Sequence, residues 1–145
     1  MAKTYSRETA GPLGSTAFEK TDSRTYRSTL KRIRATVDYD GQAIADTISL
    51  GKLPAGAVFS HGVILATATA GATATIAIGT AASAASMRTA AVFTAVDTPT
   101  LFGKTAAVAA DPLSGETEVL ATVGAAALPD SAAYMTIDIF YSDLS

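Results

Sequence analysis

The sequence contains no cysteine and no tryptophan, and its one histidine is His61. Without cysteine, neither disulfide bonds nor thiolate–metal sites can stabilise the chain, and one histidine leaves no second imidazole to complete a metal site. Charged residues make up 17% of the sequence, compared with about 25% in an ordinary soluble domain. A surface with so little charge does little to oppose association. These absences favour a protein that functions within an assembly.

Small residues are abundant instead, with 31 alanines, 21 threonines and 11 glycines among 145 residues. A chain of this length suffices for one domain with a buried core. Its charge is distributed unevenly, because residues 1–34 hold eight basic and three acidic residues, whereas the remainder holds three basic and ten acidic. This asymmetry favours a basic arm that meets an acidic partner, either nucleic acid or an acidic protein surface. A solvated, flexible tail is the alternative.

Residues 1–29 are predicted to form an extended N-terminal arm. They contain Gly-Pro and Gly-Ser steps and no sustained period of a strand or a helix. Aromatic residues occur singly, at Tyr5, Phe18 and Tyr26, as in segments that dock on a neighbour. The arm lacks the apolar run of a signal peptide, and the longest apolar stretch, around 63–66, is too short and too polar to span a bilayer. We therefore expect a soluble protein made in a cytoplasm.

From Leu30 onward the pattern is that of β-strands. Apolar and polar side chains alternate, and glycine, proline and aspartate mark the turns. The segment 57–68 is apolar at both parities, so a strand there should be covered on both faces, by a second sheet and by a subunit. The Ala/Thr/Gly strand at 73–79 presents a small-residue surface suited to close packing. The expected strands lie at 30–39, 44–50, 57–68, 73–79, 116–123 and 133–142.

Four segments between these strands are less regular. Residues 51–56 and 109–115 are predicted to be turns, and Pro54 excludes a central strand in the first. Residues 80–96 form either a short helix, which alanine favours, or an excursion with one strand, and 98–105 form a loop or an edge strand. Seven or eight short strands without a βαβ rhythm or a fixed repeat predict an all-β fold. We expect an antiparallel, jelly-roll-like β-sandwich over residues 30–145.

No combination of residues predicts an active site. His61 shares its parity with Phe59, Val63 and Leu65, which indicates a core or interface histidine and not a catalytic base. The run Asp-Tyr-Asp-Gly at 38–41 resembles half of a calcium loop, but the downstream bidentate acid is absent, so a hairpin turn is preferred.

The other charged residues give no stronger signal. Glu116 and Glu118 share one strand face, where they are typical of a solvated edge that resists unwanted pairing. The Gly-Lys steps of the chain lack the glycine frame of a phosphate loop. Tyr26 alone is interleaved with the basic cluster, so we do not expect nucleic acid as a partner. The sequence therefore predicts no enzyme activity, no cofactor and no metal ion.

Three segments of the body carry distinctive motifs: DTISLGKLPAGAVFSHGVIL at 46–65, IAIGTAASAASM at 76–87 and GETEVLATVGAAALPDSAAYMTIDIFYS at 115–142. Together they resemble a family of small virion structural proteins of tailed bacteriophages, over residues 44–142. The resemblance implies a jelly-roll-like domain of the decoration or cementing type, which sits on the assembled shell and braces adjacent capsomers. It also implies the major capsid protein as partner, a place on the capsid surface of the virion after synthesis in the host bacterial cytoplasm, and no catalytic residues.

The leading hypothesis is a homo-oligomer, with a trimer as one form, whose arm lies over neighbouring capsid subunits. Aromatic residues of the arm would be apolar anchors, and basic residues would pair with capsid carboxylates. The alternatives are a head-fibre base, collar or tail-associated virion protein, and a carbohydrate-binding β-sandwich module, against which the 7% aromatic content argues. A membrane is not expected as a partner. The predicted partner-binding residues are Tyr5, Phe18, Arg24, Tyr26, Arg27, Arg32 and Arg34.

Overall fold

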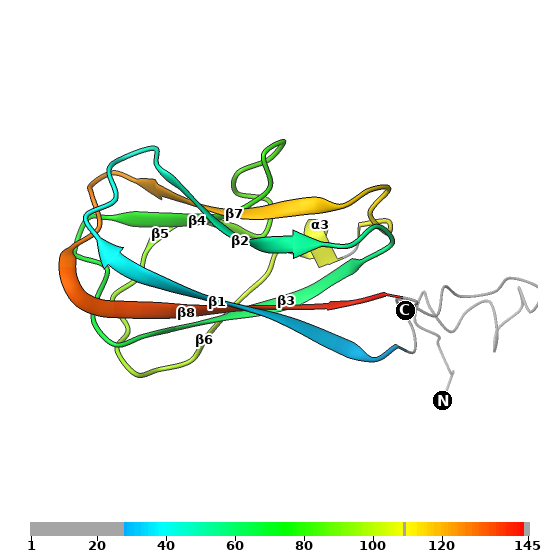
Figure 1. The fold of residues 1–145 in the computed structure, drawn as a ribbon, viewed down its shortest axis with the longest axis horizontal. Helices are drawn as coiled ribbons and strands as arrows, with labels where there is room; N and C mark the ends of the chain where they lie inside the picture. Colours follow the sequence, from blue (N-terminus) through cyan, green and yellow to red (C-terminus); the bar gives the residue numbers. More distant parts are fainter. Residues whose placement is uncertain (1–27, 109, 144–145) are drawn as a thin grey trace, which may run out of the picture.

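The computed structural model describes residues 28–108 and 110–143, which form eight β-strands and one short helix (Figure 1). No helix among these residues is long and apolar enough to cross a membrane. The elements in chain order are β1 (Leu30–Asp40), β2 (Thr47–Leu53), β3 (Val58–Ala66), β4 (Thr75–Gly79), β5 (Arg88–Val92), β6 (Thr100–Phe102), α3 (Thr105–Val108), β7 (Thr117–Gly124) and β8 (Asp130–Ser142).

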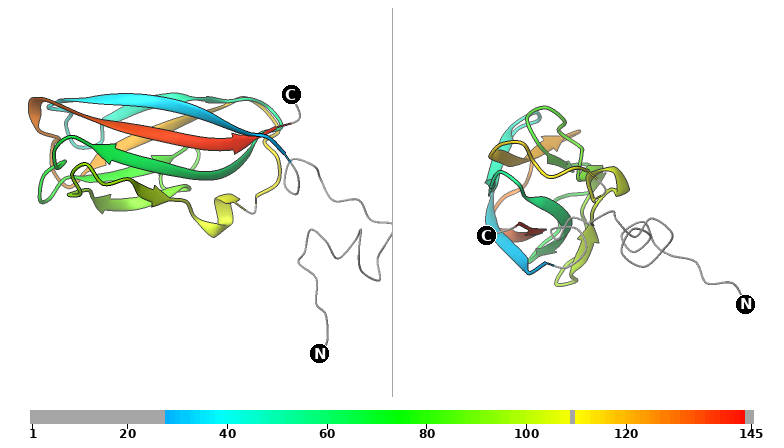
Figure 2. Two further views of the ribbon diagram at one scale, coloured as in Figure 1. Left: turned by 90° about the horizontal axis from the view of Figure 1, so that it is seen from below. Right: turned by 90° about the vertical axis from the view of Figure 1, so that its right-hand side faces the viewer.

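The strands form two antiparallel four-stranded sheets, with the orders β1-β8-β3-β6 and β2-β7-β4-β5. We call them the β8 sheet and the β7 sheet. The first strand pairs with the eighth, the second with the seventh, the third with the sixth and the fourth with the fifth. This nested pairing is the topology of a jelly roll. The sheets pack face to face (Figure 2), so the predicted all-β antiparallel sandwich is confirmed.

The core lies between the sheets and consists of the alternate residues that each strand turns inward. Ile137 and Ile139 of β8, Ile64 of β3, Ile78 of β4 and Val119 of β7 are fully buried. Burial of an aliphatic side chain of this size contributes roughly 1.5–3 kcal/mol relative to leaving it in water. The contact between the two sheets is therefore the main source of stability.

The half-buried strand predicted at 30–39 is also confirmed. Val37 and Tyr39 are buried, whereas Thr36 and Asp38 between and beside them are exposed. The Tyr39 hydroxyl donates a 2.6 Å hydrogen bond to the main-chain carbonyl of Ala68, which satisfies the one polar atom of this buried ring. Burial raises the pKa of Tyr39.

The second strand begins and ends later than predicted. β2 starts at Thr47 and continues through Leu53, so the turn is confined to the residues after it, where Ala57 donates a hydrogen bond to the Pro54 carbonyl. The reason is a β-bulge between Ser49 and Gly51, which lets the strand continue past the glycine. Gly51 has φ +130°, and a Cβ there would lie 2.8 Å from Cγ2 of Ile33 on β1.

The alanine-rich segment 80–96 contains a strand and no helix. Its strand, β5, pairs with β4, and the Arg88 guanidinium donates hydrogen bonds to the main-chain carbonyls of Ile76, Ala91 and Val92. The bond to Ile76 joins β5 to β4, and together with the strand pairing it overrides the helix propensity of alanine. The edge strand expected within 98–105 is β6, and the short helix α3 that follows it is absent from the sequence-based prediction.

Candidate assembly surfaces

A β-bulge in β3 turns His61 to the outside of the sandwich. The pairing of β3 with β8 shifts between Phe59 and His61, so Ser60 is the extra residue. Phe59 therefore points into the core, whereas the His61 ring stacks on Phe140 of β8 with centroids 4.7 Å apart and planes at 13°. Nδ1 of His61 lies 2.9 Å from the Ser60 hydroxyl oxygen. The predicted shared parity of His61 and Phe59 is wrong, because a bulge shifts the alternation by one residue.

Cross-strand pairing identifies the side chains on the outer face of the β8 sheet, which we call the β8 face. From β1 to β6 this face changes from basic to apolar, and Leu101 on β6 is 72% exposed. Arginine, aromatic and apolar side chains are the types enriched in protein–protein interfaces. The rows are Arg32–Phe140–His61, Arg34–Asp138–Val63–Leu101 and Thr36–Thr136–Leu65.

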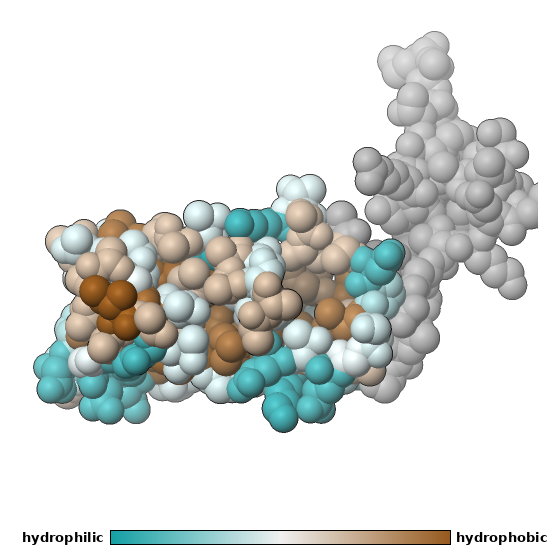
Figure 3. Space-filling model, turned by 90° about the horizontal axis from the view of Figure 1, so that it is seen from above, coloured by the Kyte–Doolittle hydropathy of each residue, from teal (hydrophilic) through white to brown (hydrophobic). Residues whose placement is uncertain are grey.

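The outer face of the β7 sheet, which we call the β7 face, is made of small and uncharged residues over most of its area. Its rows include Thr47–Thr122–Ala77 and Ser49–Leu120–Gly79. Figure 3 shows this face, which is mostly pale tan and white, with hydrophilic residues mainly toward the edges. The small-residue surface predicted for 73–79 is therefore present. An exposed ion pair of 3.5 Å joins Lys52 to Glu116.

The two predicted partner-binding arginines that the structure describes lie on β1. Arg34 makes a bidentate ion pair with Asp138 of β8, with two hydrogen bonds of 2.8 Å. Its carboxylate partner is thus within the same chain. Arg32 is exposed beside Phe140 on the β8 face. The hydrogen bonds from Arg34 lower the pKa of Asp138, burial acts in the opposite direction, and the charges of Arg34 and Arg32 lower it further.

This pair predicts a loss of stability in acid. Because the pKa of Asp138 is lower in the folded state, its contribution is complete above the unfolded pKa of about 3.9 and disappears as the pH falls through the folded value. We expect Asp138→Asn to be less stable than the wild type at pH 7, and we expect the difference to shrink below about pH 4. Urea unfolding at pH 7, 4 and 2.5 measures this, with Asp40→Asn at the exposed end of β1 as the control. A difference that stays constant with pH would contradict the assignment.

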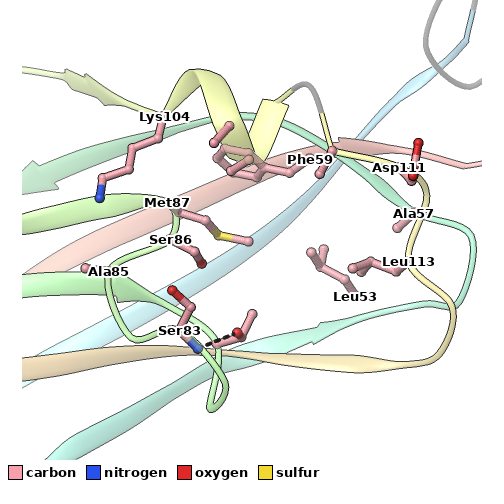
Figure 4. Close-up of a pocket in the computed structure, with 14 residues that line it drawn as sticks. Leu53, Ala57, Phe59, Ser83, Ala85, Ser86, Met87, Lys104, Asp111 and Leu113 are labelled. Carbon is pink, nitrogen blue, oxygen red and sulfur yellow. Dashed lines mark hydrogen bonds between the residues drawn. The ribbon is translucent and has the colours of Figure 1, made fainter.

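A cavity of about 460 Å³ opens at the end of the sandwich where β2 ends and β3 begins (Figure 4). We call it the end cavity. Three chain segments form it: the β2–β3 turn, the β4–β5 loop and the connection through α3 from β6 to β7. Backbone hydrogen bonds from Gly56 to the Leu113 carbonyl and from Leu113 to the Ala57 carbonyl join two of these segments. The larger apolar side chains that line it are Leu53, Phe59, Met87 and Leu113, and its charged lining residues are Lys104 and Asp111.

The other predicted partner-binding residues belong to the N-terminal arm. Tyr5, Phe18, Arg24, Tyr26 and Arg27 lie outside the described residues.

Among the described residues, no group of three or more His, Cys, Asp and Glu side chains could hold a metal ion. The hairpin turn predicted at 38–41 is wrong. β1 continues through Asp40, Gly41 follows it with φ +67°, and the chain turns only at 44–45, before it enters the other sheet at β2.

Sequence reasoning missed both the end cavity and the apolar half of the β8 face. The cavity is formed by three connections that are distant in sequence, so no local sequence pattern predicts it. The apolar half does have a signal, because Val63 and Leu65 alternate with the buried Ile64. The same run of apolar residues also fits a strand covered on both faces, which is the structure that the sequence predicts.

Comparison with known proteins gives matches of fold. No protein-family model and no curated protein matches the sequence. Three solved structures contain a similar chain, each aligned over 81% of this one: the cyanophage Pam1 capsid asymmetric unit (TM-score 0.66, 18% identity, 86% of that chain), the capsid of Ralstonia phage GP4 (0.63, 19%, 85%) and the acidic stable capsid of Helicobacter pylori bacteriophage KHP30 (0.60, 17%, 90%). At these identities the likeness is one of fold. It agrees with the jelly roll that the sequence motifs imply.

Proposed function

We propose that this chain is a structural protein of a tailed-bacteriophage virion and that it decorates or cements the capsid shell. The observation that carries the proposal is the fold match to chains in three phage capsid structures. Each alignment covers similar shares of both chains, so the matched chains are about as long as this one. A small jelly roll of this size suits an accessory subunit that braces a shell. On this proposal the chain acts by binding, without chemistry, as a component of the virion.

The β8 face is the surface we assign to the major capsid protein. It combines exposed aliphatic side chains, Leu65 and Leu101, with the Phe140–His61 stack and an exposed arginine, Arg32. The apolar half would supply affinity by leaving water, and the basic edge would set the register against capsid carboxylates. The arm preceding β1 would extend the contact beyond the domain.

The β7 face is the surface we assign to contacts between copies of the chain. Its small, uncharged side chains allow another backbone to approach closely. Few charged groups have to lose water when it is covered. A trimer is one form such a homo-oligomer can take. Sedimentation of the free protein measures its state, and a monomer at all concentrations would contradict this assignment.

A single charge on the β8 face is expected to weaken capsid binding. Leu101→Glu places a carboxylate in the apolar half, on β6 beside Val63, and because Leu101 is 72% exposed, the fold should be unaffected. Loss of one well-buried aliphatic contact and burial of a charge should together lower the affinity about 30-fold or more. The measurement is co-sedimentation with capsids purified without this protein. Ile44→Glu, at a residue that is 58% exposed in the β1–β2 connection, is the matched control. Equal binding of both variants and the wild type would reject the β8 face as the docking surface.

A further inference from the structure

The end cavity has the properties of a binding site for an apolar side chain. Its volume of about 460 Å³ lies within the range of roughly 300–1,000 Å³ typical of binding pockets. Apolar side chains dominate its lining, from Phe59 and Leu53 on one side to Met87 on the other (Figure 4). Lys104 and Asp111 supply one charge of each sign, and neither is ion-paired within the part of the chain that the structure describes.

We propose that, in the free protein, the end cavity binds Phe18 from the N-terminal segment of the same chain. That segment joins the domain close to the cavity. Leu30, the first residue of β1, pairs with Ser142, which pairs in turn with Val58, and the neighbouring Ala57 lines the cavity. The start of β1, the end of β8 and α3 lie at one end of the sandwich in both views (Figures 1 and 2). The 27 residues before Ser28 therefore enter the domain at the cavity's own end.

The length of chain between each aromatic residue and Ser28 limits which of the three can reach the cavity. The far side of the cavity, at Lys104 just after β6, lies about three strand spacings of 4.8 Å from β1 within the sheet. Tyr26 is two residues from Ser28 and can extend only about 7 Å, which is too short. Phe18 is ten residues from Ser28 and can extend about 33 Å, so it reaches easily.

Charge and polarity favour Phe18 over Tyr5, which is also within reach. Phe18 carries no hydroxyl group that would need a partner in an apolar cavity. It is followed directly by Glu19 and Lys20, whose charges are opposite to those of Lys104 and Asp111. Tethering through a short segment of the same chain gives an effective concentration in the millimolar range. The segment of the same chain should therefore occupy the cavity before that of another copy.

Disulfide trapping tests the proposal on the full-length free protein. The chain has no cysteine, so the two introduced thiols are the only ones, and an intrachain disulfide can form only between them. Ala17→Cys combined with Ser83→Cys at the mouth of the cavity should form an intrachain disulfide on mild oxidation. The product is detected as a faster band on a non-reducing gel. Ala17→Cys with Ala127→Cys, in the β7–β8 connection at the opposite end of the domain, is the control and should not form it.

Two further substitutions identify Phe18 as the occupant. Adding Phe18→Ala to the trapping pair should slow disulfide formation about tenfold or more, the ratio that burial of an aromatic ring supplies. Adding Tyr5→Ala should leave the rate unchanged. Ala106→Phe, which fills the cavity from α3, should slow the reaction as Phe18→Ala does. Thermal unfolding of each variant shows that the domain is intact.

Three outcomes would overturn the proposal. A disulfide-linked dimer would assign the cavity to the segment of a second copy. An unchanged rate with Phe18→Ala would reject this residue, and trapping as fast in the Ala127 control would reject the cavity. The measurement needs no capsid, so its result is independent of the proposed function. If it succeeds, Tyr5 and Tyr26 remain as the arm's anchors for a capsid.

Discussion

Gly62→Val is expected to destabilise the domain severely, by about 3 kcal/mol or more. Gly62 lies on β3 directly opposite Phe102 of β6, and a Cβ at this position would lie 2.0 Å from Cζ of the Phe102 ring. That ring is buried and packs against Phe59, with centroids 6.4 Å apart. Because a side chain at Gly62 would occupy the space of the ring, Phe102 would have to move into water. The short edge strand β6 would then lose its main apolar contact.

Denaturant unfolding measures this effect, with Gly115→Val as the matched control. Gly115 lies in the β6–β7 connection, and a Cβ there has no heavy atom within 4 Å. The control should therefore change the free energy of unfolding by no more than about 0.5 kcal/mol. Adding Phe102→Ala to Gly62→Val should recover part of the loss, because it removes the clashing ring. If Gly62→Val is as stable as the control, the packing of Phe102 over Gly62 is wrong.

Deletion of residues 2–27 is expected to lower affinity for capsids about 100-fold or more while leaving the domain folded. The arm carries Tyr5, Tyr26 and five basic residues, whereas the body that remains holds ten acidic and six basic residues. Loss of two aromatic anchors at roughly 1.5–3 kcal/mol each accounts for a change of this size, even after the entropy of ordering the arm is subtracted. Binding isotherms with capsids purified without this protein give the value.

Two full-length variants separate the contributions of the anchors and the charges. Tyr5→Ser with Tyr26→Ser should weaken binding at every salt concentration. Arg24→Gln with Arg27→Gln should weaken it mainly at low salt, since exposed ion pairs are screened. Unchanged affinity after deletion of 2–27 would reject the arm as a capsid-binding element, whatever the result for Leu101→Glu on the β8 face.

Strand positions can be predicted from the sequence where alternation is uninterrupted, as in 30–39 and 133–142. Elsewhere a β-bulge makes the alternation misleading. One extra residue at Ser60 reverses which side chains of β3 point inward. The predicted β2 boundary is wrong for the same reason at Gly51. In the 80–96 segment, pairing with β4 and the hydrogen bond from Arg88 to the Ile76 carbonyl outweigh local helix propensity. These are tertiary contacts, which a pattern of neighbouring residues cannot include.

The candidate surfaces are less accessible to prediction than the fold. The small-residue β7 face follows from composition, and Arg32 is exposed, as a binding residue has to be. Sequence reasoning assigns Arg34 to a carboxylate of the capsid. In the structure it pairs with Asp138, which is 104 residues away and therefore cannot be identified from a local pattern. The strand order of the jelly roll cannot be predicted from the sequence either, since another Greek-key sandwich gives the same alternation of apolar and polar residues.

Cryo-electron microscopy of particles purified from cells infected with the native phage tests the central claim most directly. We expect density for the jelly roll at regular lattice positions on the outer shell. The β8 face should be turned toward the major capsid protein, and the arm should lie over neighbouring subunits. Density confined to the portal vertex or the tail, or absence of the chain from the particle, would contradict the claim that it decorates or cements the capsid.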